Sequence, residues 1–122
     1  MEARSGWPAE KQPQGDDMAN FLLVYTGGGM PATDTERKKV MDDWGAWFSK
    51  LGPAVVDPGN PISHAKNISS DGSVHEGAVG MTASGYSVLK ADSLDKAVAL
   101  AKSCPVLKSG AKISVYETIQ AM

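Results

Sequence analysis

The feature that most constrains the fold is a helical apolar stripe between Thr33 and Leu51. The large apolar residues of this segment recur at spacings of three and four: Val40, Trp44, Trp47, Phe48 and Leu51. This period places them on one side of a helix. Because two tryptophans and a phenylalanine form a large hydrophobic surface, the stripe must pack against the rest of the chain.

Both ends of this helix are marked in the sequence. Thr33, followed three residues later by Glu36, forms a capping box in which each side chain satisfies a backbone N–H of the other residue. Gly52 and Pro53 then end the helix, because glycine adopts the capping conformation and proline cannot continue the helix. Gly45 costs about 1 kcal/mol relative to alanine in a helix interior. We therefore expect either a close neighbour at Gly45 or a tolerated loss.

The segment Asn20–Thr26 predicts a strand with two apolar faces. Its apolar residues are consecutive: Phe21, Leu22, Leu23, Val24 and Tyr25. Side chains alternate between the faces of a strand, so an unbroken apolar run is typical of a strand buried on both sides.

The later segments continue the alternation of strands and helices. We expect strands at Ala54–Asp57, Gly85–Ala91 and Lys112–Thr118, and a second helix at Ser93–Ser103 with Asp92 as its N-cap. Between Ala54–Asp57 and Gly85–Ala91, the segment Ile62–Ile68 is a strand or an irregular arm, and we favour a strand. Ser69–Ser73 predicts a turn, and Val74–Ala83 is ambiguous.

This order predicts an α+β fold, a ferredoxin-like βαββαβ sandwich with two helices on one face of an antiparallel sheet. Helices on one face cannot cover both faces of the first strand. We therefore expect a homodimer packed face to face through its sheets. We expect Phe21, Leu23 and Tyr25 to be the residues that need this second copy as cover.

Length and charge narrow the class of protein. The 122 residues suggest a single domain, 18–122, preceded by a polar segment, 1–17, that we expect to be a disordered extension or tag. A net charge of −2 argues against nucleic-acid binding. No apolar run approaches the roughly 20 residues that span a bilayer. Cys104 is the single cysteine, and we expect a cytoplasmic protein.

Several segments, taken together in their order and spacing, resemble one family. They are Phe21–Tyr25, Trp44–Phe48, Leu51–Gly52, Asp57–Pro61, Gly85–Ser87, Ala91–Ala97 and Cys104–Pro105. This order resembles the YCII-related family, particularly its branch named for a DGPF motif. The resemblance implies a dimeric α+β barrel of ferredoxin-like protomers.

The same resemblance implies little about activity. Some members of the family carry a histidine–aspartate pair proposed as catalytic, with the histidine on the first helix. This chain has no histidine between Thr33 and Leu51, and it lacks the string DGPF. Asp57 corresponds to the aspartate, but the pair does not carry over without its histidine.

Asp57 and His64 are the candidate catalytic residues. Imidazole titrates near neutrality, so His64 beside Asp57 would suit a general base; the alternative is a solvated loop histidine. The second histidine, in His75–Glu76, provides no third ligand at a metal-binding spacing. Gly27–Gly29 lacks the residues of a phosphate-binding loop. We therefore expect no metal and no cofactor.

Tyr25, Tyr86, Tyr116 and Trp44 are the candidate ligand-binding residues. If the three tyrosines share the sheet face away from the helices, they line a semi-polar cavity for a small organic molecule. The alternative is that they pack at the dimer interface. We expect a small-molecule binder or enzyme with a cleft between the sheet and the first helix. The other candidate is a non-catalytic dimeric accessory or interaction module.

Overall fold

The computed structural model describes residues 18–29 and 31–120, so our expectation for 1–17 lies outside the described part of the chain. Within these ranges the strands are β1 (Ala19–Thr26), β2 (Val55–Asp57), β3 (Lys66–Ile68), β4 (Val74–Glu76), β5 (Ala83–Ala91) and β6 (Lys112–Glu117). The helices are α1 (Asp34–Leu51) and α2 (Leu94–Ala101). Short 3₁₀ turns follow each helix, at Gly52–Ala54 and Pro105–Ser109.

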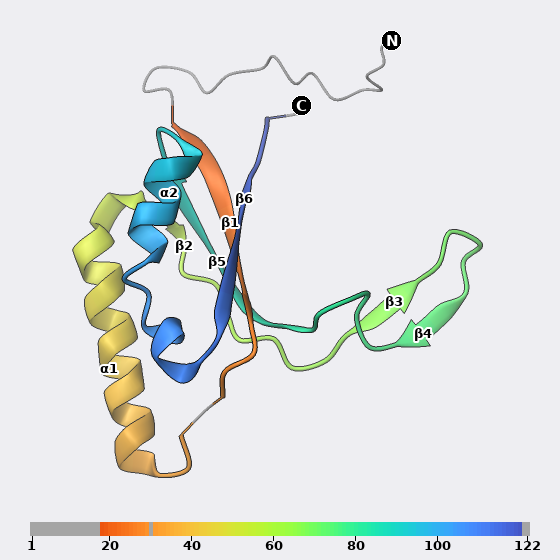
Figure 1. The fold of residues 1–122 in the computed structure, drawn as a ribbon, viewed down its shortest axis with the longest axis horizontal. Coiled ribbons are helices and arrows are strands. Elements are labelled where there is room, and N and C mark those ends of the chain that lie inside the picture. Colours follow the sequence, from red (N-terminus) through yellow and green to blue (C-terminus); the bar gives the residue numbers. More distant parts are fainter. Residues whose placement is uncertain (1–17, 30, 121–122) are drawn as a thin grey trace.

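The main sheet has four strands in the order β2-β5-β1-β6, and every neighbouring pair is antiparallel. Both helices lie on one side of this sheet (Figure 1). The predicted α+β class is confirmed, and the strand order is compatible with a ferredoxin-like fold. The remaining strands, β3 and β4, form a separate hairpin between β2 and β5.

The predicted capping box of α1 forms in one direction only, because the Glu36 carboxylate accepts a hydrogen bond from the Thr33 hydroxyl at 3.0 Å and not from the Thr33 backbone N–H. The Thr33 hydroxyl oxygen accepts a hydrogen bond from the Glu36 backbone N–H at 3.1 Å, and the helix ends at Gly52 with a positive φ of 57°. Apart from its chain neighbours and the nearby backbone of its own helix, no atom lies within 4 Å of the position that a Cβ on Gly45 would occupy. The helix therefore tolerates Gly45 without a packing reason for it.

The predicted N-cap of the second helix is wrong by one residue. Ser93, not Asp92, has the extended backbone of a cap, and its hydroxyl accepts a hydrogen bond from the Lys96 backbone N–H at 3.1 Å. The helix also ends earlier than expected, at Ala101.

The hairpin occupies the two segments that the sequence left open. Only Lys66–Ile68 of the expected strand Ile62–Ile68 is a strand, and it pairs with Val74–Glu76 from the ambiguous segment. The turn between them forms as predicted. Its Asp71 carboxylate accepts a hydrogen bond from the Ser73 backbone N–H at 2.9 Å. These two short strands form because they pair with each other. Hydrophobic periodicity within one segment does not predict such pairing.

The core lies between the main sheet and the two helices. It contains the inward-facing residues of β1 and β5 and small residues of α2: Phe21, Leu23, Tyr25, Leu89, Ala91, Ala97, Ala101, and with them Trp47 and Cys104. Phe21 and Leu23 are fully buried within the single chain. Our expectation that a second copy covers Phe21, Leu23 and Tyr25 is therefore wrong, because these side chains lie on the face of β1 that the chain's own helices cover.

The loop after β2 packs closely on β5. The Asn60 carbonyl accepts a hydrogen bond from the Tyr86 backbone N–H at 3.3 Å, and the Ile62 N–H donates to the Ser84 carbonyl at 3.0 Å. Gly59 has a positive φ of 80°, and a Cβ on this residue would lie 1.7 Å from the Tyr86 carbonyl oxygen. Only glycine fits this approach between the loop and the strand.

Gly59→Ala should therefore destabilise the protein, while Gly45→Ala should stabilise it. The first change adds backbone strain and a collision, with an expected loss of about 2–4 kcal/mol in the free energy of unfolding. The second removes a helix-interior glycine and should add about 0.5–1 kcal/mol. Urea unfolding of both variants measures the difference. An unchanged stability in Gly59→Ala would contradict the close approach described here.

Candidate functional site

A buried chain of hydrogen bonds crosses the helix side of the sheet. The Tyr25 hydroxyl donates to the Ser87 hydroxyl oxygen at 2.7 Å, and the Ser87 hydroxyl donates to the Pro58 carbonyl oxygen at 2.7 Å. These bonds connect β1, β5 and the loop after β2. Buried polar groups need such partners because an unpaired one costs about 1–3 kcal/mol.

The sequence analysis did not identify Ser87 as part of this arrangement. Ser87 is fully buried, and it is the one buried polar residue among those the structure describes. Its position in the strand could have identified it, because Ser87 and Leu89 are two residues apart and therefore lie on the same, core-facing side of β5.

Trp44 packs against Tyr25 from α1. The two rings meet edge to face with centroids 5.5 Å apart, and Trp44 also contacts Trp47 and Phe48. Trp47 is buried, and its indole N–H donates to the Ser103 hydroxyl oxygen at 2.9 Å. The space between α1 and the sheet is therefore occupied by protein side chains at Tyr25 and Trp44, where we expected a cleft.

Burial changes the acidity of two groups in this region. It raises the pKa of the Tyr25 hydroxyl well above its ordinary range, an effect that the hydrogen bond with Ser87 opposes and Cys104 reinforces. Burial also raises the pKa of the Cys104 thiol. A buried thiol with a raised pKa is a poor nucleophile, so Cys104 fits a structural role in the core.

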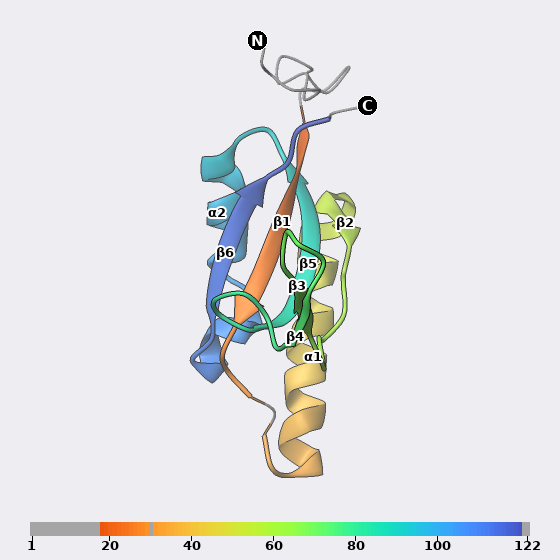
Figure 2. The ribbon, with the colours of Figure 1, turned by 90° about the vertical axis from the view of Figure 1, so that its right-hand side faces the viewer.

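The opposite face of the sheet, which we call the open face, is apolar at its centre and carries Asn20 with Lys90, and Thr26 with Lys112, toward its two ends. In the middle of the sheet, Leu22 lies between Val88 and Tyr116. In the next row of the same face, Val24 lies between Tyr86 and Ser114. Figure 2 shows these strands without a helix in front of them. Antiparallel sheets with one face in solvent usually carry polar residues there, so this surface needs an explanation.

The three candidate tyrosines do not share a face. Tyr86 and Tyr116 lie on the open face, whereas the Tyr25 side chain lies on the helix side with its hydroxyl bonded to Ser87. The expectation of a cavity lined by all three is wrong. The cause is strand parity: Tyr25 is an odd number of residues from Leu22 and Val24, the β1 residues that pair with Tyr116 and Tyr86.

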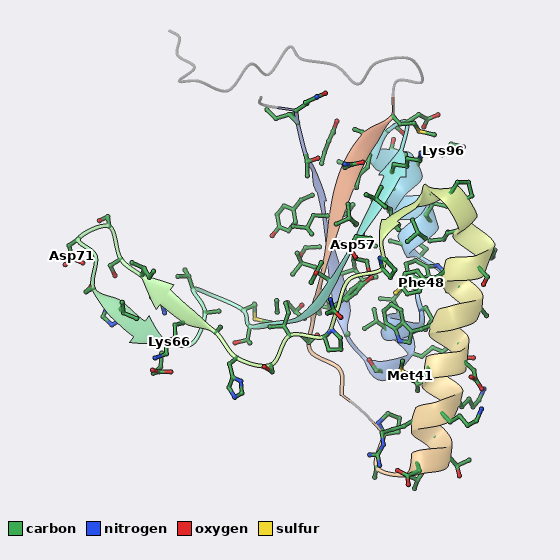
Figure 3. The ribbon with its side chains drawn as sticks, turned by 180° about the vertical axis from the view of Figure 1, so that it is seen from behind. Met41, Phe48, Asp57, Lys66, Asp71 and Lys96 are labelled. Atoms are coloured by element: carbon green, nitrogen blue, oxygen red, sulfur yellow. The ribbon has the colours of Figure 1, made fainter. Side chains whose placement is uncertain are left out.

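The structure does not bring the two candidate catalytic residues together. The Asp57 carboxylate accepts a hydrogen bond from the Gly59 backbone N–H at 2.8 Å, so it stabilises its own turn. A ring nitrogen of His64 lies 3.0 Å from the hydroxyl oxygen of its neighbour Ser63. Across residues 18–29 and 31–120, no hydrogen bond or ion pair joins Asp57 to His64. Figure 3 shows Asp57 on the body of the protein.

A shallow groove of about 350 Å³ lies on the helix side, between α2 and the edge strand β6. Apolar side chains and one lysine line it: Leu94, Val98, Ala101, Lys102, Leu107, Ile113 and Val115. Leu94 and Leu107 are each about two fifths exposed at its rim. The sequence analysis placed a cleft at the first helix, and the structure places this groove at the second.

In the described part of the chain, no three His, Cys, Asp or Glu side chains converge on one point. None of the described helices is both long and apolar enough to cross a bilayer.

Comparison with protein-family models and with curated proteins gives no match for this chain. The resemblance to the YCII-related family therefore stays a prediction based on the segments that carry it.

The buried tyrosine should make stability depend on alkaline pH. Because the pKa of Tyr25 is higher in the folded state than its unfolded value of about 10, the folded state keeps a proton that the unfolded state releases. The contribution of Tyr25 to the free energy of unfolding is therefore complete below about pH 10. Above this pH it decreases, by up to about 1.4 kcal/mol per pH unit.

Tyr25→Phe should lower stability by about 1 kcal/mol near neutral pH, since it removes the hydrogen bond to Ser87. It should also remove the Tyr25 share of the alkaline loss, so the wild type and the variant converge above about pH 10. Urea unfolding across this range measures both effects. Parallel pH profiles for the two proteins would contradict the buried, protonated state of Tyr25.

Proposed function

We propose that this chain functions as a homodimeric interaction module in which two copies pack face to face through their open faces. The observation that carries the proposal is the apolar centre of the open face, formed by Leu22, Val24 and Val88. A sheet in a stable domain buries its apolar faces against another layer. The chain's own helices provide that layer on one face only (Figure 1).

A second copy is the simplest layer for the other face. Two identical faces related by a two-fold axis bury the same residues on both sides, so one apolar surface satisfies both copies. The resemblance to the YCII-related family implies the same arrangement, a dimeric α+β barrel. Tyr86 and Tyr116 would lie at or near the interface, where phenol rings provide both apolar area and a hydrogen-bonding hydroxyl.

Val24→Asp should weaken the dimer at least tenfold, which is about 1.4 kcal/mol. Val24 is central on the open face, and an unpaired carboxylate buried between two sheets is unfavourable. Sedimentation equilibrium measures the dissociation constant, and circular dichroism checks that the variant is folded. Met41→Asp is the matched control, because Met41 is an exposed apolar residue on α1. A wild type that stays monomeric at high micromolar concentration would contradict the proposal.

The groove beside α2 favours a second candidate function, the binding of a small molecule. Its volume of about 350 Å³ falls in the range of ligand sites. Apolar walls and the ammonium group of Lys102 suit a molecule with an apolar body and a carboxylate. This candidate moves the small-molecule site from the first helix, where Trp44 and Tyr25 are in contact, to the second.

Octanoate tests the groove in a thermal-shift measurement. Binding to the folded state at 100 times the dissociation constant stabilises by about 2.7 kcal/mol, which raises the melting temperature. Val98→Asp, which places a carboxylate in the groove, should abolish the shift, while Met41→Asp should keep it. A shift of the same size in wild type and Val98→Asp would contradict binding in this groove.

A further inference from the structure

The β3–β4 hairpin stands away from the rest of the protein on a segment, 63–82, that we call the arm (Figure 1). Its two strands pair only with each other, in a sheet separate from the main one. In Figure 3, Lys66 and Asp71 mark the length of the arm at a distance from the body that carries Asp57. An isolated two-stranded hairpin is at best marginally stable in water, so the arm needs further contacts to keep this conformation.

One face of the arm is apolar near its tip. Ile68 and Val74 are cross-strand partners and therefore lie on the same face, with 71% and 59% of their surfaces exposed. In the irregular segment that returns to the body after β4, Val79 and Met81 are 82% and 73% exposed. Exposed apolar groups gathered on one projecting element are typical of an interaction site.

The charges of the arm are largely neutralised within it. Lys66 and Glu76 are also cross-strand partners, and their side chains form an ion pair at 3.2 Å. On the opposite face, the Asn67 amide donates to the Gly77 carbonyl oxygen at 3.0 Å. These groups have partners already, so the free binding capacity of the arm lies in its apolar residues.

The direction of the arm identifies its partner. The arm projects from the side of the sheet opposite the helices, and in the view onto the open face it stands in front of the sheet (Figures 1 and 2). A sheet packed on the open face would lie about 10 Å away. The extended chain from Ser63 to Asp71 spans up to about 25 Å. The arm therefore extends past a partner sheet and reaches the layer behind it.

We propose that the arm of each protomer clasps the other protomer of the dimer, with Ile68 and Val74 against the partner's surface. This inference rests on the proposed face-to-face dimer. The two-fold symmetry of such a dimer gives each copy one arm around its partner. The binding partner of the arm is thus a second copy of this chain, the same molecule that covers the open face.

Neighbouring residues of β4 provide a matched test. Val74 and His75 are both exposed but point to opposite faces of the hairpin, so Val74→Asp and His75→Asp add the same charge to opposite sides. Val74→Asp should weaken the dimer at least tenfold in sedimentation equilibrium, and His75→Asp should change the dissociation constant less than twofold. Ile68→Asp should repeat the loss. Near-ultraviolet circular dichroism reports on the core tryptophans and shows that each variant keeps its fold.

Hydrogen exchange of the arm provides the second measurement. The backbone amides of β3 and β4 should exchange at least tenfold more slowly at concentrations where the wild type is dimeric than where it is monomeric. A dimer whose affinity is unaffected by Val74→Asp and Ile68→Asp, or whose arm exchanges at the same rate in both states, would overturn the clasp and leave the dimer standing. A wild type that is monomeric throughout would overturn both.

Discussion

The structure depends on a strand, β1, that is apolar on both sides. One alternation, with Phe21 and Leu23, is buried beneath the two helices of the same chain. The other, with Leu22 and Val24, lies in the centre of the open face. Since β1 pairs with both β5 and β6, it is an interior strand of the sheet. Its outward apolar residues therefore lie away from the sheet edges. The first face explains the fold of the single chain, and the second is the reason to propose a dimer.

A single buried hydrogen-bond chain connects the core to the loop that leads into the arm. Tyr25 of β1 donates to the Ser87 hydroxyl of β5, Ser87 donates to the Pro58 carbonyl oxygen, and Gly59 then passes close against the backbone of β5. The loop fixed in this way leads directly into the arm. These contacts on the core side of the sheet fix the loop after β2. The chain then leaves the body on the side of the open face. These contacts thus fix the loop from which the arm leaves the body.

Local signals predicted the helices and the central strands well, because caps and periodicity act over a few residues. The N-cap at Thr33 and the strand at the apolar run of β1 formed as expected. The faces of the strands were not predictable, because they depend on pairing between distant segments; this is why Tyr25 was placed with Tyr86. The partner of Asp57 was missed for a related reason. Its carboxylate binds the backbone of its own turn, an interaction that residue types alone do not separate from catalysis.

The central claim is that a second copy covers the open face. The most direct measurement is an isotope-filtered nuclear Overhauser experiment on a mixture of labelled and unlabelled chains. It detects contacts between methyl groups of different protomers only. The account predicts intermolecular signals among the methyls of Leu22, Val24 and Val88. Signals from these methyls to water or to their own chain alone, at a concentration where the protein is fully associated, would contradict it.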